Sequence, residues 1–185
     1  MNNMPQPEII AISDSLRLRK YDGNYEIMLA GYQDPYVYQN SEGIFDENQK
    51  PDLDYVKGMC EFLDRAGELY FIEVKENGSF ISIGDVTVKA ENPPIAIWVE
   101  KYRGVGIGSD VMKAVIDRLK ELGVKRIIGS TVFKWNLPSQ KLHQKLGFQC
   151  VGENEKEYIY NLDIVTENDT GEKVESYTRE RIHLP

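Results

Sequence analysis

Residues 102–112 read YRGVGIGSDVM, where three alternating glycines, Gly104, Gly106 and Gly108, lead into a stretch with helical character. Glycine loses more conformational freedom on folding than any other residue, so a cluster of glycines needs a reason. One reason is a tight turn between a strand and a helix. Another is the approach of a ligand to backbone N–H groups at the start of a helix, where unpaired donors and a partial positive charge suit phosphate oxygens. The stretch taken alone favours neither explanation.

The composition is that of one ordinary globular domain. The chain has 185 residues, of which 41% are apolar and 28% charged, and this is enough chain to bury a core. No apolar run approaches the roughly 20 residues needed to span a bilayer. The first ten residues, MNNMPQPEII, hold no basic stretch followed by an apolar one, so we see no secretory signal. We therefore expect a cytoplasmic protein without a membrane partner.

Cysteine and histidine are too sparse to form a recognisable metal site. Cys60 and Cys150 belong to no motif, and we expect two reduced, mostly buried thiols. The chain has two histidines, His143 and His183, so we do not expect a histidine-based zinc site or another metal centre.

The charges are unevenly distributed along the chain. The net charge of −8 argues against a nucleic-acid partner. Residues 101–149 nevertheless hold ten Lys/Arg and only three Asp/Glu, whereas the remainder holds 12 Lys/Arg and 27 Asp/Glu. Solvated helix faces would explain the basic segment. So would an anionic ligand on this segment, with a cationic ligand on the acidic remainder.

Hydrophobic periodicity predicts a mixed α/β domain over residues 16–164. Residues 1–15 form a lead-in, and residues 165–185 show no clear pattern. Strands are predicted at 16–21, 68–76, 79–90, 93–100, 125–133, 148–152 and 157–164, and helices at 24–35, 52–67, 109–122 and 136–147. The intervening residues 34–51 read as a polar loop that holds at most a helical turn.

Local signals support several of these boundaries. Asn77-Gly78 predicts a tight hairpin turn between two strands. Asp52 and Asn136 are candidate N-caps of the helices that follow them. Gly123 follows the apolar stripe after the glycine stretch and predicts the end of that helix.

The glycine stretch does not fit the common phosphate loops. A G-x-G-x-x-G motif starting at Gly104 requires glycine at position 109, which is Ser109, and an acidic residue about 20 positions later, where Lys125 and Arg126 stand. A P-loop requires Gly-Lys-Ser/Thr, which is absent. What remains is Arg-x-x-Gly-x-Gly, from Arg103 to Gly108, between a strand and an amphipathic helix.

Two segments together make the sequence similar to the GNAT superfamily of acetyl-CoA-dependent N-acetyltransferases. They are VEKYRGVGIGSDVMKAVI, which contains this motif, and WNLPSQKLHQKLGF, which resembles the family's N-x-x-S/A…G-F segment. The order of predicted elements extends the resemblance over about residues 16–164. The opening LRLRKY…YQDPYVYQ looks most like the branch that contains ribosomal-protein and antibiotic acetyltransferases.

The resemblance implies a fold with α and β elements mixed in one domain. We expect a central, mostly antiparallel sheet of six to seven strands, flanked by about four helices. Two central strands of this sheet are expected to splay apart.

The resemblance also implies residues that bind acetyl-CoA. The amides of residues 104–109 would cradle the pyrophosphate, with charge added by Arg103. The backbone of the preceding strand would pair with the pantetheine arm, and Asn136 and Ser139 would lie beside it. The full expected set is Ile97, Trp98, Val99, Arg103, Gly104, Val105, Gly106, Ile107, Gly108, Ser109, Asn136 and Ser139. For the side chain of Trp98 we expect a place in the core.

Catalytic residues are less clearly marked. His143 stands where relatives often have a tyrosine that protonates the leaving thiolate, and it is either the catalytic acid or a packing residue. Glu100, Asp85 and Glu91 are candidate bases for the amine, and a chain of water molecules is the alternative. Glu100 leads slightly because it follows the strand beside which the acetyl group is expected.

The first functional hypothesis is direct transfer of an acetyl group from acetyl-CoA to a primary amine in a ternary complex. The acceptor would be a small cationic molecule or a protein N-terminus. The second hypothesis is a GNAT-fold module that holds coenzyme A without catalysis, as a sensor or assembly subunit. We expect a monomer or a homodimer.

Overall fold

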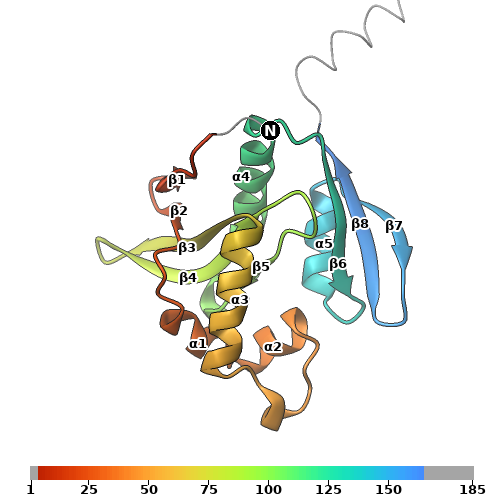
Figure 1. The fold of residues 1–185 in the computed structure, drawn as a ribbon, viewed down its shortest axis with the longest axis horizontal. Helices are drawn as coiled ribbons and strands as arrows, with labels where there is room; N and C mark the ends of the chain where they lie inside the picture. The colour runs from red at the N-terminus through yellow and green to blue at the C-terminus, as the bar shows by residue number, and fades with distance from the viewer. Residues whose placement is uncertain (1–3, 165–185) are drawn as a thin grey trace, which may run out of the picture.

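The computed structural model describes residues 4–164, so the C-terminal residues 165–185 lie outside the described part of the chain. The domain combines two antiparallel sheets with helices on their faces (Figure 1). The strands are β1 (Ile9–Ala11), β2 (Leu16–Lys20), β3 (Glu68–Glu76), β4 (Ser79–Val88), β5 (Ile95–Ile97), β6 (Arg126–Phe133), β7 (Gln149–Glu153) and β8 (Glu157–Asp163). The α-helices are α1 (Glu26–Tyr32), α2 (Pro35–Ser41), α3 (Leu53–Ala66), α4 (Ile107–Glu121) and α5 (Leu137–Lys145), with short 3₁₀ turns η1 (Glu47–Gln49) and η2 (Glu100–Tyr102).

The predicted fold class is confirmed, and the expected splay divides the strands into two sheets. The first sheet has the order β1-β2-β3-β4-β5, and the second has the order β6-β8-β7. The two sheets meet at one end, where Glu91 forms a parallel bridge with Ile128 and Asn92 N–H donates to Ile128 O at 2.9 Å. Beyond this bridge β5 and β6 are not paired, and they leave a gap between the sheets.

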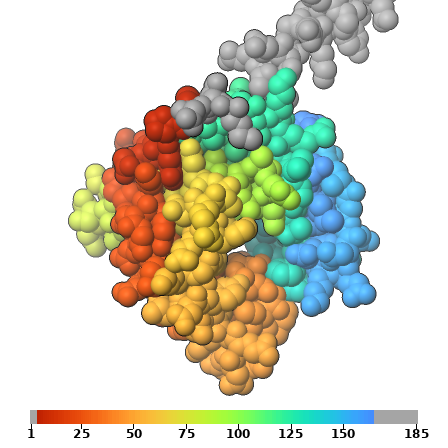
Figure 2. Space-filling view, in the orientation of Figure 1, coloured from red at the N-terminus to blue at the C-terminus, as the bar shows by residue number. Residues whose placement is uncertain are grey.

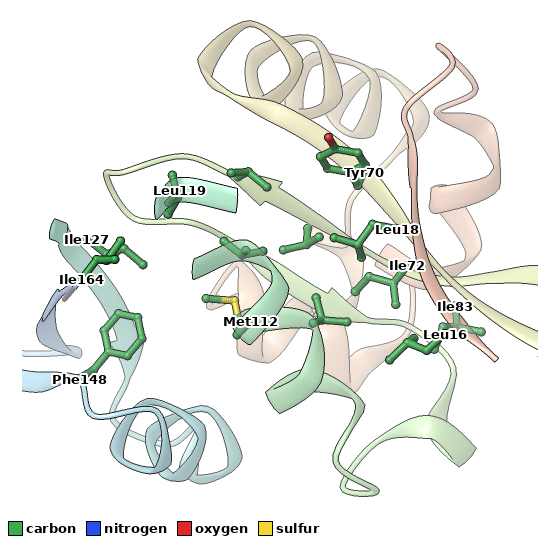
Figure 3. Packing of buried hydrophobic residues seen from close by; sticks show 14 of the residues in the cluster. Leu16, Leu18, Tyr70, Ile72, Ile83, Met112, Leu119, Ile127, Phe148 and Ile164 are labelled. Carbon is green, nitrogen blue, oxygen red and sulfur yellow. The ribbon is translucent and has the colours of Figure 1, made fainter. Parts of the chain in front are cut away.

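Two apolar layers hold the domain together. Helix α4 packs on one face of the first sheet, where Met112 and Leu119 contact a core that includes Ile72 and extends to Phe148 near the second sheet (Figure 3). Helices α1 and α3 cover the other face through a second cluster, which contains Trp98. The first cluster contains residues of both sheets, such as Ile72 on β3 and Val132 on β6, and so it joins the two sheets.

The predicted turn and cap signals are present in the structure. Asp52 accepts a hydrogen bond from Tyr55 N–H at 2.8 Å and starts α3, and Asn136 accepts one from Ser139 N–H at 3.1 Å and starts α5. Asn77 has a positive φ of 50°, as the tight turn between β3 and β4 requires.

Three predictions are wrong in part. The helix expected at 24–35 ends at Tyr32, and a second helix, α2, begins at Pro35 in the region expected to be a loop. Residues 9–11 of the lead-in form β1, which pairs with β2. Cys60 is buried as expected, but Cys150 is exposed because it lies on the edge strand β7.

The described helices do not include one long and apolar enough to cross a membrane.

Candidate active site

A cavity of about 750 Å³ opens between the two sheets. Its size is within the range of ordinary ligand pockets. Its walls come from α2, β5, the glycine loop and α5, and Figure 2 shows the surface hollowed just above α2, which is orange in that view. The lining residues are Tyr36, Val37, Asn40, Ser41, Ile95, Ala96, Ile97, Arg103, Gly104, Gly106, Gly108, Ser109, Asn136, Leu137, Pro138, Ser139, Lys141, Leu142 and Lys145.

The glycine loop at residues 104–108 is shaped to receive a ligand against its backbone. Gly104 and Gly106 have φ angles of +72° and +100°, a conformation that favours glycine, and a Cβ added at either would meet no heavy atom within 4 Å. Gly106 is the N-cap of α4, a helix of 15 residues. The amides of residues 105–108 donate to no acceptor within the described residues. Unpaired amides at the positive end of the α4 dipole are suited to the oxygens of an anion.

Arg103 lines the cavity, but its side chain is already engaged. Its Nε donates to Ile97 O at 2.9 Å, and its Nη2 donates to Trp98 O. The guanidinium also lies 3.4 Å from Asp34 and 4.4 Å from the ring centre of Tyr36. The predicted phosphate contact of Arg103 is therefore not favoured by this geometry, because the side chain points at the end of β5 and at α2.

The cavity edge of β5 presents free backbone groups. Trp98 N–H donates to Ile83 O at 2.8 Å, and Thr87 N–H donates to Pro94 O at 3.2 Å. Because backbone groups of successive strand residues point to opposite sides, Ile95 and Ile97 turn theirs toward the cavity. The carbonyl of Ile97 already accepts from Arg103 Nε, so the groups left free among the described residues are those of Ile95 and the N–H of Ile97. Of the three residues expected to pair with pantetheine, Ile97 fits, whereas Trp98 and Val99 lie beyond the end of β5 and do not line the cavity.

Helix α5 forms the opposite wall and supplies positive charge. Asn136 and Ser139 line the cavity, and their contact with the pantetheine arm stays a prediction. Lys141 and Lys145, which the sequence analysis did not single out, also line it, and neither pairs with a carboxylate within residues 4–164. Their spacing of four residues places them on one face of the helix, which was a usable signal in the sequence.

His143 lies away from the cavity. The ring is buried, with Nε2 2.8 Å from Ser130 Oγ and Nδ1 2.8 Å from Ser139 O. The nearby carbonyl of Ser139 favours a proton on Nδ1, which leaves Nε2 to accept from the Ser130 hydroxyl. Burial lowers the pKa of His143, although the carbonyl of Ser139 partly opposes this. A neutral, buried ring corresponds to the packing alternative, and the expected role as catalytic acid is not favoured.

Asp85 is fully buried one layer behind the cavity wall. It accepts hydrogen bonds from Tyr32 Oη at 3.0 Å and from Trp98 Nε1 at 2.8 Å. Burial raises the pKa of Asp85 to about 7, and the charge of Glu42 adds to this, whereas the two hydrogen bonds oppose it. Trp98 is held tightly here, since a Cβ on Gly31 would lie 2.4 Å from its ring. The geometry makes Asp85 an anchor for the end of β5, without direct access to the cavity.

The other candidate bases are also outside the cavity. Glu100 is exposed at the start of η2, and Glu91 is exposed at the bridge between the sheets. The structure therefore does not bring Glu100, Asp85, Glu91 and His143 together around one reacting centre. None of these four side chains lines the cavity, and the proton acceptor for the amine stays a prediction.

The charged residues that line the cavity, Arg103, Lys141 and Lys145, are all basic. Helix α2 belongs to a segment, residues 21–49, that contains six Asp/Glu and no Lys or Arg. The opposite wall carries Lys141 and Lys145. The α2 residues that line the cavity, Tyr36, Val37, Asn40 and Ser41, are uncharged. The six carboxylates therefore act on the cavity only from outside its wall, while the α5 side is suited to an anion.

The fold defines the class of protein: two antiparallel sheets splay apart around a cavity, and a glycine loop at the start of α4 opens into that cavity. The acetyltransferase (GNAT) family matches residues 32–148, and the chain belongs to this family. The family predicted from the two sequence segments is thus confirmed.

Similar proteins agree with this assignment. A spermine/spermidine N(1)-acetyltransferase of Bacillus subtilis (strain 168) is 39% identical over 54 residues, which are 29% of this chain and 36% of that protein. The chain thus spans little more than a third of this curated relative.

Solved structures share the fold over a larger part of the chain. A domain from Methanocaldococcus jannaschii has a TM-score of 0.68 and 24% identity, covering 81% of this chain and 99% of that one. The microcin C7 self-immunity acetyltransferase MccE, solved with acetyl-CoA and AMP, has a TM-score of 0.63 and 18% identity, covering 85% and 97%. An acetyl transferase from Salmonella typhimurium that modifies the N-terminal serine of ribosomal protein L7/L12 has the same fold at 18% identity.

Proposed function

We propose that this protein transfers an acetyl group from acetyl-CoA to a primary amine on a cationic acceptor. The observation that carries the proposal is one continuous cavity that joins the unpaired amides of the glycine loop to the free backbone edge of β5. The acceptor is a small cationic molecule or a protein N-terminus.

The residues present fit acetyl-CoA. The open space over Gly104 and Gly106 accommodates a pyrophosphate that approaches the amides directly, where a side chain would obstruct it. Lys141 and Lys145 supply the positive charge that was expected of Arg103. The peptide-like pantetheine arm pairs with the outward backbone groups of Ile95 and with the N–H of Ile97, as an added strand pairs with a sheet edge, while the carbonyl of Ile97 remains bonded to Arg103.

The chemistry is nucleophilic attack of the neutral amine on the thioester carbon. A C–N bond forms, the C–S bond breaks, and the sulfur leaves as a thiolate that takes up a proton. The protein contributes chiefly by holding the two substrates in one geometry and by offering fixed backbone donors near β5. Since His143 and Asp85 do not line the cavity, water carries the protons in this proposal.

The acidic segment that leads into and out of α2 favours a cationic acceptor. Six carboxylates without a basic residue in residues 21–49 attract an amine that carries further positive charge. This agrees with the polyamine substrates in the name of the Bacillus subtilis relative.

One observation favours a second candidate function, a coenzyme-binding module without catalysis. His143, at the position of the tyrosine in relatives, is buried against Ser130 and offers no proton to the cavity. The glycine loop and β5 would serve such a module equally well.

A turnover screen tests the proposal. The purified chain is incubated with acetyl-CoA and each of a set of acceptors: a polyamine, amine antibiotics and peptides with free N-termini. Free thiol is measured with a colorimetric assay, and acetylated product is measured by mass spectrometry. We expect steady thiol release matched by acetylated product for a cationic acceptor. Tight coenzyme binding without product for any acceptor would support the non-catalytic module instead.

A further inference from the structure

Helix α2 is tied at its C-terminal end to the second sheet. The last carbonyls of a helix have no partner within the helix. In α2, Gln39 O accepts a hydrogen bond from Trp135 Nε1 at 3.1 Å, and Asn40 O accepts one from Asn136 Nδ2 at 3.2 Å. Both donors lie 96 positions further along the chain, in the turn between β6 and α5.

The N-terminal end of α2 is tied to the first sheet. Asp34 is the N-cap of α2 and accepts a hydrogen bond from Tyr36 N–H at 2.9 Å. The guanidinium of Arg103 lies 3.4 Å from Asp34 and 4.4 Å from the ring centre of Tyr36, while it also donates to Ile97 O at 2.9 Å. One arginine thus connects this end of α2 to the edge of β5.

Between these two attachments α2 forms one wall of the cavity. Its residues Tyr36, Val37, Asn40 and Ser41 face the same space as β5 and α5. The helix has seven residues, and helices of this length are marginal without tertiary contacts. In Figure 1 it lies below the gap between β5 and α5. Its position therefore depends on side chains that reach it from both sides of the cavity.

We propose that α2 is a strap across the cavity, held by Arg103 on one side and by Trp135 and Asn136 on the other, and that these three are positioning residues for the acceptor amine. This inference rests on the proposed function. Helix α2 contributes Tyr36, Val37, Asn40 and Ser41 to the cavity wall opposite α5, and the six carboxylates of residues 21–49 lie in the segment around this helix. A strap that loosens at either end lets this wall move relative to the thioester.

Substitutions that remove one donor at a time test the strap. Trp135→Phe removes the Nε1 donor and keeps an aromatic ring over Phe133, on which Trp135 stacks with ring centres 4.5 Å apart. Asn136→Ser removes the Nδ2 donor and keeps a hydroxyl that can still cap α5. Gln140→Met is the matched control, because Gln140 donates to Phe133 O and Lys134 O in the same turn.

Hydrogen–deuterium exchange of residues 35–44 is measured first, since it requires no activity. We expect the amides of α2 to exchange about three- to tenfold faster in Trp135→Phe and in Asn136→Ser, because each variant loses one hydrogen bond. In Gln140→Met we expect the exchange rate of these amides to be unchanged. If the α2 amides of both variants exchange as slowly as those of Gln140→Met, the proposal that α2 is a strap is wrong, even if the wild type acetylates amines.

Kinetics then test the link to the acceptor. In Trp135→Phe we expect the KM of the acceptor to rise about three- to tenfold while the Kd of acetyl-CoA is unchanged. A raised Kd with an unchanged acceptor KM would overturn the positioning role, because it would make the residue part of the coenzyme site. A wild type that acetylates no amine refutes the proposed function and this positioning role, and leaves the exchange result to decide whether α2 is tethered.

Discussion

Replacement of Asp85 by asparagine should change the stability of the protein in a pH-dependent way. Asp85 is fully buried, and the described residues place no basic side chain against it. Asparagine has nearly the same shape, and its carbonyl oxygen can accept from Trp98 Nε1 while its amide meets Tyr32 Oη. The substitution therefore removes the ionisable proton and little else.

The magnitude follows from the pKa of Asp85. Burial raises it from 3.8 to about 7, so between these values the folded protein keeps a proton that the unfolded chain has lost. The unfolded state then binds fewer protons, and the free energy of unfolding falls as pH rises through this window. The shift spans about three pH units, and each unit lowers the free energy of unfolding by roughly 1.4 kcal/mol. The wild type thus loses on the order of 4 kcal/mol by pH 8, and Asp85→Asn does not undergo this loss.

Urea unfolding at pH 5 and pH 8 measures this effect. All other titrating groups are shared by the wild type and the variant, so the difference between the two proteins isolates Asp85. We expect the variant to gain about 3 kcal/mol of stability relative to the wild type between pH 5 and pH 8, because about two pH units of the shift lie in this window. A difference that does not change with pH would refute the assignment of a buried carboxyl with a raised pKa.

Three further predictions concern the cavity and its surroundings. Lys141→Gln with Lys145→Gln should weaken coenzyme A binding several-fold at low salt and flatten its salt dependence, measured by calorimetry, because both lysines line the cavity without a carboxylate partner within residues 4–164. His143→Ala should lower the free energy of unfolding by about 1–3 kcal/mol, seen as a lower melting temperature, because it leaves the buried Ser130 hydroxyl unpaired. Turnover per folded molecule should be retained. A stable variant with at least about tenfold lower turnover would restore the catalytic role of His143. The KM of a cationic acceptor should rise with added salt, because residues 21–49 carry six carboxylates and no basic residue; a salt-independent KM would remove the charge argument.

Much of the fold could be predicted because its signals are local. The apolar stripe after Gly108, the caps Asp52 and Asn136 and the Asn77-Gly78 turn each depend on neighbouring residues, and each is present in the structure. Helix α2 was missed although Asp34-Pro35 is an N-cap followed by proline at the first helical position, because the proline was interpreted as the end of the preceding helix.

The site was predicted less completely because spacing does not give the direction of a side chain. Arg103 and His143 stand at the expected positions, yet one is bound to the carbonyls of β5 and the other is turned to Ser130 on β6. Those directions are set by partners from other elements. The α2 wall likewise depends on contacts between residues 96 positions apart, such as Trp135 with Gln39, which no local pattern indicates.

The central claim is that the glycine loop binds the pyrophosphate of acetyl-CoA, and a matched pair of glycine variants tests it most directly. Gly106 and Gly23 both have positive φ, +100° and +88°, and a Cβ at either meets no heavy atom within 4 Å. Gly106→Glu and Gly23→Glu therefore introduce comparable backbone strain and the same charge, and only the first places a carboxylate at the cavity. Calorimetric titration with coenzyme A should show binding to the wild type and to Gly23→Glu, and a loss of at least about tenfold in Gly106→Glu. Unchanged affinity in a folded Gly106→Glu variant would contradict the account.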